Sequence, residues 1–295
     1  SEEGFRKAKE YFERSIELDY SFAPAYAELA NYYMFMLQMR LIVVTEAFPR
    51  IFHSIRKALE IDPDHDQANY AMALMSWFEW DWKACERGFL KVLETNSNHA
   101  LTNGFYAHLL MLTGRIDLAL TYSRKAVELD PHNDLALSLY GVVLLHSGQM
   151  EKAIEVAKES MEINPQNILT LRLFEFSSYP NGDIETSVQM LDLIYTRVFP
   201  IKLDIKKEYA ENGYRSMIEK VAFELEGNSK GQDLYIALFY NRAGQSEKAI
   251  QWLENAYENH DGDIPYLFRD REFDTLQSDP RFRARAEKAK LPLNL

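Results

Sequence analysis

The chain has 295 residues, of which 47% are hydrophobic and 26% charged, and its formal net charge at pH 7 is −12. This composition is that of an ordinary globular protein and excludes a disordered or membrane-embedded chain. The acidic balance argues against direct binding to a nucleic-acid backbone, which requires a basic face.

Few helix-breaking residues punctuate the sequence. Its 12 glycines and 10 prolines favour helices joined by short loops over a many-stranded β fold. The single cysteine, Cys85, excludes an internal disulfide and fits a reducing compartment. Polar side chains interrupt the longest apolar stretch, residues 29–44, so no membrane-spanning helix is predicted. Because the chain starts at Ser1 without signal-peptide features, we expect a piece of a longer protein, cytoplasmic or the soluble part of a membrane-anchored regulator.

The N-terminal residues are predicted to form the second helix of a hairpin. Ala8, Phe12 and Ser15 lie on its buried stripe, and its partner helix is expected upstream. Without that partner the stripe stays partly uncovered, so self-association or fraying is expected. The first exit turn, at 18–20, precedes the turn at Pro63 by 43 residues, which is a 34-residue period plus a nine-residue insertion within 40–49.

The period itself comes from three similar exit turns. Their prolines, Pro63, Pro131 and Pro165, are 68 and 34 residues apart, and the midpoint of the wider interval falls in the polar turn 94–98. Gly114 and Gly148 mark turns at the same period. Each period is therefore predicted to be a hairpin of two helices.

Small residues recur with this period as well. One series occupies the first helices and another the second helices of the hairpins: Ala73, Ala107 and Gly141, then Cys85, Ala119 and Ala153. Since small side chains let two helices approach closely, these positions are predicted to be buried contacts. Trp82, just after a hairpin turn, is predicted to be a core aromatic.

The pattern weakens after Pro165. Glu175 and Ser187 stand where small residues are expected, so looser packing is predicted there. Residues 201 to about 227 are predicted to form another hairpin. A regular unit then returns, with small residues at Ala237, Gly244, Ala249 and Ala256.

The C-terminal end carries a helix start signal. Ser278 and Asp279 can cap a helix, Pro280 suits its first turn, and a charged helix is predicted over 281–290. Such a helix closes the open end of a repeat array and keeps it soluble.

Small residues, glycine turns and closing prolines at this period resemble tetratricopeptide repeats. The resemblance implies an all-α fold, a right-handed α-solenoid of about seven helical hairpins with a C-terminal capping helix. It implies a repeat array over 1–200 with an incomplete N-terminal hairpin. Residues 201–295 would add a degenerate hairpin, one regular hairpin and the cap, continuous with the array.

Three stretches carry a narrower resemblance. Residues 12–19, 79–86 and 273–282 are similar to repeat arrays that follow winged-helix DNA-binding or nucleotide-cyclase domains in bacterial signalling proteins. The resemblance implies a protein-interaction or sensory module of a signalling or transcription-regulatory protein. The alternative is the regulatory C-terminal region of a larger enzyme such as an adenylate or guanylate cyclase. A third possible function is oligomerisation alone.

No group of residues predicts catalysis. The seven histidines include no pair three or four residues apart, so no metal site is expected, and no phosphate-binding loop or nucleophile elbow is found. The acidic cluster 62–66 around His65 is interpreted as an exit turn and helix N-cap. Cys85, equivalent to Ala119 and Ala153, is interpreted as packed. We therefore expect no enzyme and no cofactor.

The candidate binding surface follows from the repeat. In such arrays the first helix of each hairpin lines the concave face, and the first-helix residues off the small-residue stripe are mostly apolar or aromatic. The candidate partner-binding residues are Asn31, Tyr70, Trp77, Phe78, His108, His146, Arg172, Phe176 and Tyr179.

The residue types of this surface indicate which kind of partner it can bind. Only Asn31 and Arg172 suit a clamp for a C-terminal carboxylate, and they lie several units apart, so a chaperone-type clamp is not expected. An apolar groove suits a peptide, a helix or a partner domain, including an upstream domain of the same chain. The alternative is that these side chains fill a tightly wound superhelix.

Overall fold

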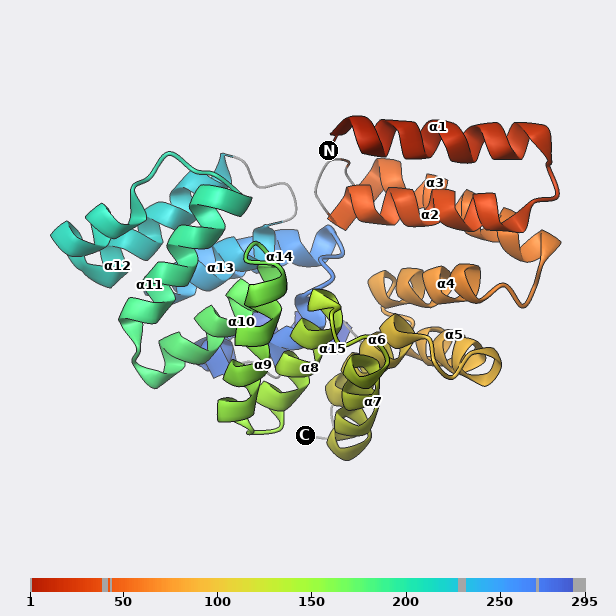
Figure 1. Ribbon diagram of the computed structural model, residues 1–295. Helices are drawn as coiled ribbons and strands as arrows, with labels where there is room; N and C mark the ends of the chain where they lie inside the picture. The colour runs from red at the N-terminus through yellow and green to blue at the C-terminus, as the bar shows by residue number, and fades with distance from the viewer. Residues whose placement is uncertain (1, 39–41, 43, 228–231, 269–270, 289–295) are drawn as a thin grey trace. The chain divides into compact units, whose positions relative to one another are not determined.

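The computed structural model describes residues 2–38, 42, 44–227, 232–268 and 271–288 (Figure 1). These residues form fifteen α-helices and no strand, which confirms the predicted all-α fold of repeated hairpins. They group into two compact units, unit 1 (Ser1–Thr102) and unit 2 (Asn103–Leu295). The division into 1–200 and 201–295 stays a prediction.

Unit 1 consists of one helix followed by helical hairpins. Its helices are α1 (Glu2–Leu18), α2 (Ala23–Gln38), α3 (Val44–Ile61), α4 (Asp66–Phe78) and α5 (Trp82–Thr95). Within it α2 pairs with α3 and α4 with α5, and α1 lies beside α2 (Figure 1). Ala8, Phe12 and Ser15 of α1 are half-buried, and Ile16 packs against Tyr26, so the predicted stripe is confirmed.

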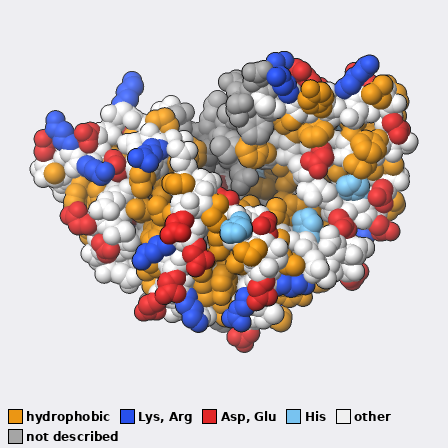
Figure 2. Space-filling model, in the orientation of Figure 1, with side chains coloured by type: hydrophobic (Ala, Val, Ile, Leu, Met, Phe, Trp, Pro, Cys, Tyr) orange, Lys and Arg blue, Asp and Glu red, His pale blue; other side chains and the backbone are white. Residues whose placement is uncertain are grey.

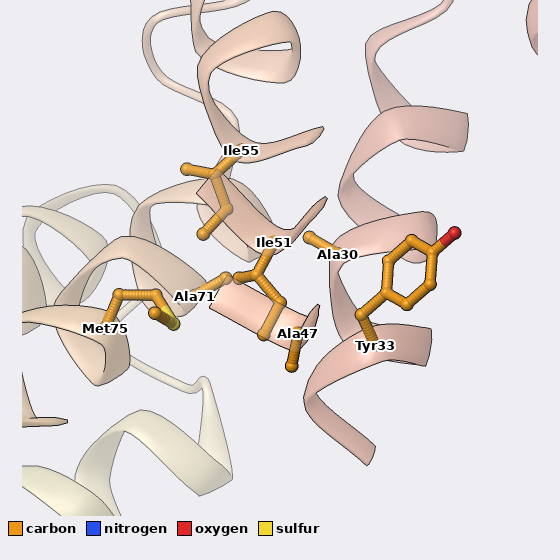
Figure 3. Packing of buried hydrophobic residues seen from close by; sticks show 7 residues of the cluster. All are labelled: Ala30, Tyr33, Ala47, Ile51, Ile55, Ala71 and Met75. Atoms are coloured by element: carbon orange, nitrogen blue, oxygen red, sulfur yellow. The ribbon is translucent and has the colours of Figure 1, made fainter. Parts of the chain in front are cut away.

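A hydrophobic cluster joins three helices of unit 1 (Figure 3). It combines side chains of α2, α3 and α4, namely Ala30, Tyr33, Ala47, Ile51, Ile55, Ala71 and Met75. Ile51 and Ile55 are one helical turn apart, so both side chains project from the same face of α3 and are fully buried. The alanines leave room for the larger side chains opposite them.

The inferred insertion falls between α2 and α3. Part of it, including Pro49, forms the first turns of α3, while residues 40, 41 and 43 lie outside the described residues. At the next exit turn Nδ1 of His65 accepts a hydrogen bond from the Ala68 amide at 3.4 Å. Asp62 Oδ1 accepts one from the Asp64 amide at 3.1 Å. The interpretation of 62–66 as an exit turn and N-cap is confirmed.

Helices α4 and α5 approach closely at small residues. A Cβ added to Gly88 would lie 2.7 Å from the Ala73 Cβ. Cys85 is fully buried, and burial raises the pKa of its thiol well above its ordinary value. Trp82 is buried as predicted, and its ring meets the Trp77 ring edge-on, with centroids 5.5 Å apart.

Unit 2 continues the hairpins and ends in shorter elements. Its α-helices are α6 (Ala100–Leu112), α7 (Ile116–Leu129), α8 (Asp134–His146), α9 (Met150–Ile163), α10 (Ile168–Ser178), α11 (Ile184–Leu193), α12 (Ile205–Glu226), α13 (Asp233–Arg242), α14 (Ser246–Glu258) and α15 (Pro280–Lys288). The boundary between the units cuts the first turn of α6. The 3-10 helices are η1 (Tyr179–Asn181), η3 (Ile264–Phe268) and η4 (Arg271–Leu276), and η2 (Ile194–Val198) is a π-helix.

The hairpin turns share one backbone conformation. Gly114, Gly148 and Gly182 have φ values of 80°, 79° and 79°, in the left-handed region that glycine adopts without a steric penalty. Trp80, 34 residues before Gly114, has φ 55°. The turn geometry therefore follows the period even where the sequence offers a tryptophan in place of a glycine.

Packing around Glu175 and Ser187 differs from the prediction. Both side chains are buried, and the Ser187 hydroxyl donates to Glu175 Oε1 at 2.8 Å. The looser packing expected there is wrong, because a hydrogen bond between the two helices replaces the contact between small residues.

Helix α12 folds back at Gly213, where φ is 79° and ψ is 173°. Lys220 Nζ lies 2.7 Å from Glu208 Oε2. In a straight helix these two residues would be about 18 Å apart along the axis. The hairpin predicted over 201–227 is therefore confirmed.

The C-terminal helix starts as predicted. Asp279 Oδ1 accepts a hydrogen bond from the Arg281 amide at 2.8 Å, and Pro280 is the first residue of α15. Helix α15 packs on α14, where Arg281 Nη2 lies 2.9 Å from Glu247 Oε1. Residues 289 and 290 of the predicted helix lie outside the described residues.

Candidate functional site

In unit 1 the candidate aromatic residues pack against other aromatic side chains, both within a hairpin and between neighbouring hairpins. Tyr70 is buried against Phe89 and His99, with ring centroids 6.3 and 5.3 Å away. Phe78 is half-buried and meets Phe48 edge-on at 5.9 Å. Asn31 is half-buried, and its Nδ2 lies 3.5 Å from Glu28 Oε2.

Trp77 was expected to point away from the buried stripe, and this expectation is wrong. The side chain is 6% exposed and packs on Trp82. Trp77 follows Ala73 by four residues, and residues four apart share one helix face. The indole therefore belongs to the α4–α5 contact.

In unit 2 the structure gathers candidate residues from first helices of successive hairpins. We call the residues His108 of α6, Arg172 and Phe176 of α10, and Tyr235 and Arg242 of α13 the first-helix face of unit 2. His108 and Arg172 are buried, and Phe176 is half-buried. The other two candidates of unit 2, His146 and Tyr179, are also half-buried. Partner binding at the nine residues stays a prediction.

Arg242 is the most strongly bound side chain of this face. Its guanidinium donates to Glu175 Oε1 at 2.5 Å, to both carboxylate oxygens of Glu272, and to the Tyr214 hydroxyl oxygen at 3.0 Å. It also lies 4.1 Å above the centre of the Tyr179 ring. Burial by itself would lower the pKa of Arg242, but the charges of Glu175 and Glu272 raise it well above its ordinary value.

Arg172 is held mainly by an aromatic ring. The carbon of its guanidinium lies 2.9 Å from the centre of the Tyr235 ring, which stacks on Phe176 at 6.3 Å. Its Nη2 has no hydrogen-bond partner among the described residues. The Tyr235 hydroxyl donates to Asp263 Oδ2 at 2.8 Å.

His108 makes two hydrogen bonds that define its tautomer. Its Nε2 lies 2.9 Å from the Leu139 carbonyl oxygen, and its Nδ1 lies 2.5 Å from the Tyr266 hydroxyl. Because a carbonyl only accepts, Nε2 carries the proton, and Nδ1 accepts from Tyr266. Burial lowers the pKa of His108 to about 4, so the ring is neutral at pH 7.

One stretch of the chain supplies hydrogen-bond partners to Tyr235, His108 and Arg242. We call residues 261–268 and 271–276 the C-terminal segment. Asp263 bonds to Tyr235, Tyr266 to His108 and Glu272 to Arg242, while Ile264 and Phe273 are buried. Two of the five residues of the first-helix face, Tyr235 and Arg242, were not among the candidates.

Sequence patterns could have indicated only part of this arrangement. Arg242 and Tyr235 lie in the first helix of the regular unit that Ala237 marks, so the rule that selected Arg172 applies to them too. The C-terminal segment has no helical period, and nothing in its sequence indicates which surface it covers.

Three further properties of the described residues bear on function. No group of three or more His, Cys, Asp or Glu side chains in the described ranges is placed to hold a metal ion. Acidic and basic side chains are interspersed on the face seen in Figure 2. Among the helices that the structure describes, none has the length and apolar character needed to cross a membrane.

Comparison with known families gives one match. Residues 110–172 match the tetratricopeptide repeat model. The matched region runs from α6 to α10 and ends at Arg172. No curated protein matches the chain.

Several solved structures are similar to this chain in fold. PilW, a widely conserved type IV pilus biogenesis factor, is 16% identical, covering 87% of this chain and 98% of that chain with a TM-score of 0.52. A human IFIT1 dimer with PPP-AAAA is 15% identical, covering 86% of this chain and 68% of that chain with a TM-score of 0.54. At these identities the likeness shows the fold alone. The family match covers residues 110–172, and the likeness over the rest of the chain is one of helical fold.

Proposed function

We propose that the chain is a protein-interaction or sensory module of a bacterial signalling or transcription-regulatory protein, which binds a peptide, a helix or a partner domain on the first helices of its repeats. The tetratricopeptide fold supports an interaction role. The resemblance of residues 12–19, 79–86 and 273–282 to regulatory repeat arrays supports the signalling context. This proposal assigns binding, and no catalysis, to the chain.

The observation that carries the proposal is the occupied first-helix face of unit 2. This face holds a non-repeat segment through an ion pair at Arg242, a hydroxyl–imidazole bond at His108 and a tyrosine–carboxylate bond at Tyr235. Peptide recognition uses the same contacts. The net charge of −12 favours a protein partner over a nucleic acid.

The test is a comparison of proteins captured by the immobilised full chain from a bacterial extract. Phe176→Ala removes a half-buried ring of the face, and Phe223→Ala removes a 64% exposed ring of α12 as the matched control. We expect a partner that wild type and Phe223→Ala retain equally and Phe176→Ala retains at least about ten-fold less. Equal retention by all three folded proteins contradicts the proposal.

A further inference from the structure

We infer that the first-helix face of unit 2 is a binding site for an extended acidic segment of a partner protein, and that the chain's own C-terminal segment occupies this site until the partner competes for it. The inference rests on the proposed function and adds to it the chemistry of the partner and a form of regulation.

Two residues of the first-helix face also have hydrogen-bond partners outside the C-terminal segment. Glu175 of α10 binds two nitrogens of Arg242, at 2.5 and 3.2 Å, so this guanidinium keeps a counter-ion when Glu272 leaves. The His108 ring is oriented by the Leu139 carbonyl, which belongs to α8. The removal of one partner from a buried ion pair is costly because it strands a charge, and here no charge on Arg242 is stranded.

The polar groups that the C-terminal segment offers define what a partner must offer. Glu272 supplies a carboxylate to Arg242, and Tyr266 supplies a hydroxyl donor to Nδ1 of His108. Asp263 supplies a second carboxylate, which accepts from Tyr235 beside the Arg172 guanidinium. A competing segment therefore carries two acidic residues with a hydroxyl-bearing aromatic residue between them.

Arg172 extends the case for an acidic ligand. It is 6% exposed, and its Nη2 lacks a hydrogen-bond partner among the described residues. A buried guanidinium donor without a partner is costly, and a carboxylate is the acceptor it matches best. A partner that places its carboxylate nearer to Arg172 than Asp263 does would gain an interaction that the C-terminal segment leaves unmade.

The position of the C-terminal segment in the chain allows a partner's segment to replace it on the first-helix face. It connects α14, which ends at Glu258, to α15, which starts at Pro280. The chain itself joins both ends of the segment to these helices, and Arg281 of α15 pairs with Glu247 of α14 at the surface, so a segment that leaves the face stays tethered to it. Such a tether gives the segment a high effective concentration and makes it an effective competitor against free peptides.

The probe is a fluorescein-labelled synthetic peptide with the sequence of residues 260–277, titrated into the full chain with anisotropy as the readout. The double variant Glu272→Gln/Tyr266→Phe weakens the contacts of the chain's own segment. Asp274→Asn, which removes an exposed acid of the same segment, is the matched control. We expect the double variant to bind the peptide at least ten-fold more tightly than wild type and the control do.

A further variant tests whether the peptide uses the same site. Tyr235→Phe, added to the double variant, removes the hydroxyl that bonds to Asp263 and keeps the ring over Arg172. We expect a several-fold loss of peptide affinity. Should the double variant fail to fold, Tyr266→Phe alone serves in the same comparison.

Equal peptide affinity in wild type and the loosened variant, or no binding by either folded protein, overturns the inference. Hydrogen exchange gives an independent outcome, because a segment that is only docked exchanges faster than helix α13 beneath it. Equal protection of the segment and of helix α13 against hydrogen exchange would show that the segment is a fixed part of the core. The proposed function would survive that result, since the capture experiment with Phe176→Ala tests it without the peptide.

Discussion

The hydrogen bonds of His108 predict how the stability of unit 2 depends on pH. The folded ring has a pKa of about 4, against an ordinary value of 6.5. Because the folded value is the lower one, the unfolded chain binds a proton first, and stability is lost as the pH falls below 6.5. Protonation of Nδ1 also reverses the hydrogen bond between α6 and η3, because the Tyr266 hydroxyl must then accept from the imidazolium where it donated before.

The size of the effect follows from the shift in pKa. With one pKa unit equal to about 1.4 kcal/mol, His108 contributes a loss of about 2 kcal/mol between pH 7 and pH 5. The loss reaches about 3 kcal/mol at pH 4. Above pH 7 both states are neutral, and His108 adds no pH dependence.

The assay compares wild type with His108→Gln by urea unfolding at several pH values between 7 and 4. Glutamine can donate to the Leu139 carbonyl and accept from Tyr266, but it does not titrate. The fall in stability between pH 7 and pH 5 should be about 2 kcal/mol larger for wild type than for the variant. His132→Gln, at an exposed histidine, is the control and should follow wild type.

Two results would refute this reasoning. One is an NMR titration in which His108 protonates near pH 6.5 in the folded protein. The other is a nitrogen spectrum that places the proton on Nδ1, since the Leu139 carbonyl requires it on Nε2.

Three further predictions concern packing and the buried charges. Gly88→Ala should destabilise the protein by about 1 to 3 kcal/mol in thermal or urea unfolding, because the added Cβ meets Ala73; an unchanged stability would place these helices farther apart. Cys85→Ala should change the unfolding free energy by less than about 1.5 kcal/mol, and the native thiol should react slowly with a labelling reagent; rapid labelling would contradict its burial. Glu175→Ala should cost about 1 to 3 kcal/mol, because it leaves Ser187 without its acceptor and Arg242 with Glu272 as its remaining carboxylate; an unchanged stability would contradict the contribution of these hydrogen bonds.

The sequence by itself determined the repeated hairpins and their turns. Positions 34 residues apart carry small residues at helix contacts and glycines at turns, and these are local requirements of helix approach and backbone conformation. For that reason Gly114, Gly148 and Ala119 were placed correctly from spacing alone. The cap at Asp279 was predictable too, since it depends only on adjacent residues.

Only the tertiary structure decided what happens on the first-helix face of unit 2. Glu175 and Arg242 are 67 residues apart in the chain, and no periodicity indicates that they form an ion pair. The sequence pattern marked Glu175 as a defect in a stripe of small residues, whereas the fold uses it to neutralise a buried guanidinium. The C-terminal segment lacks any period, so its place on Arg242, His108 and Tyr235 depends on side-chain charge and hydrogen bonding across distant parts of the chain, which become neighbours only when the helices pack.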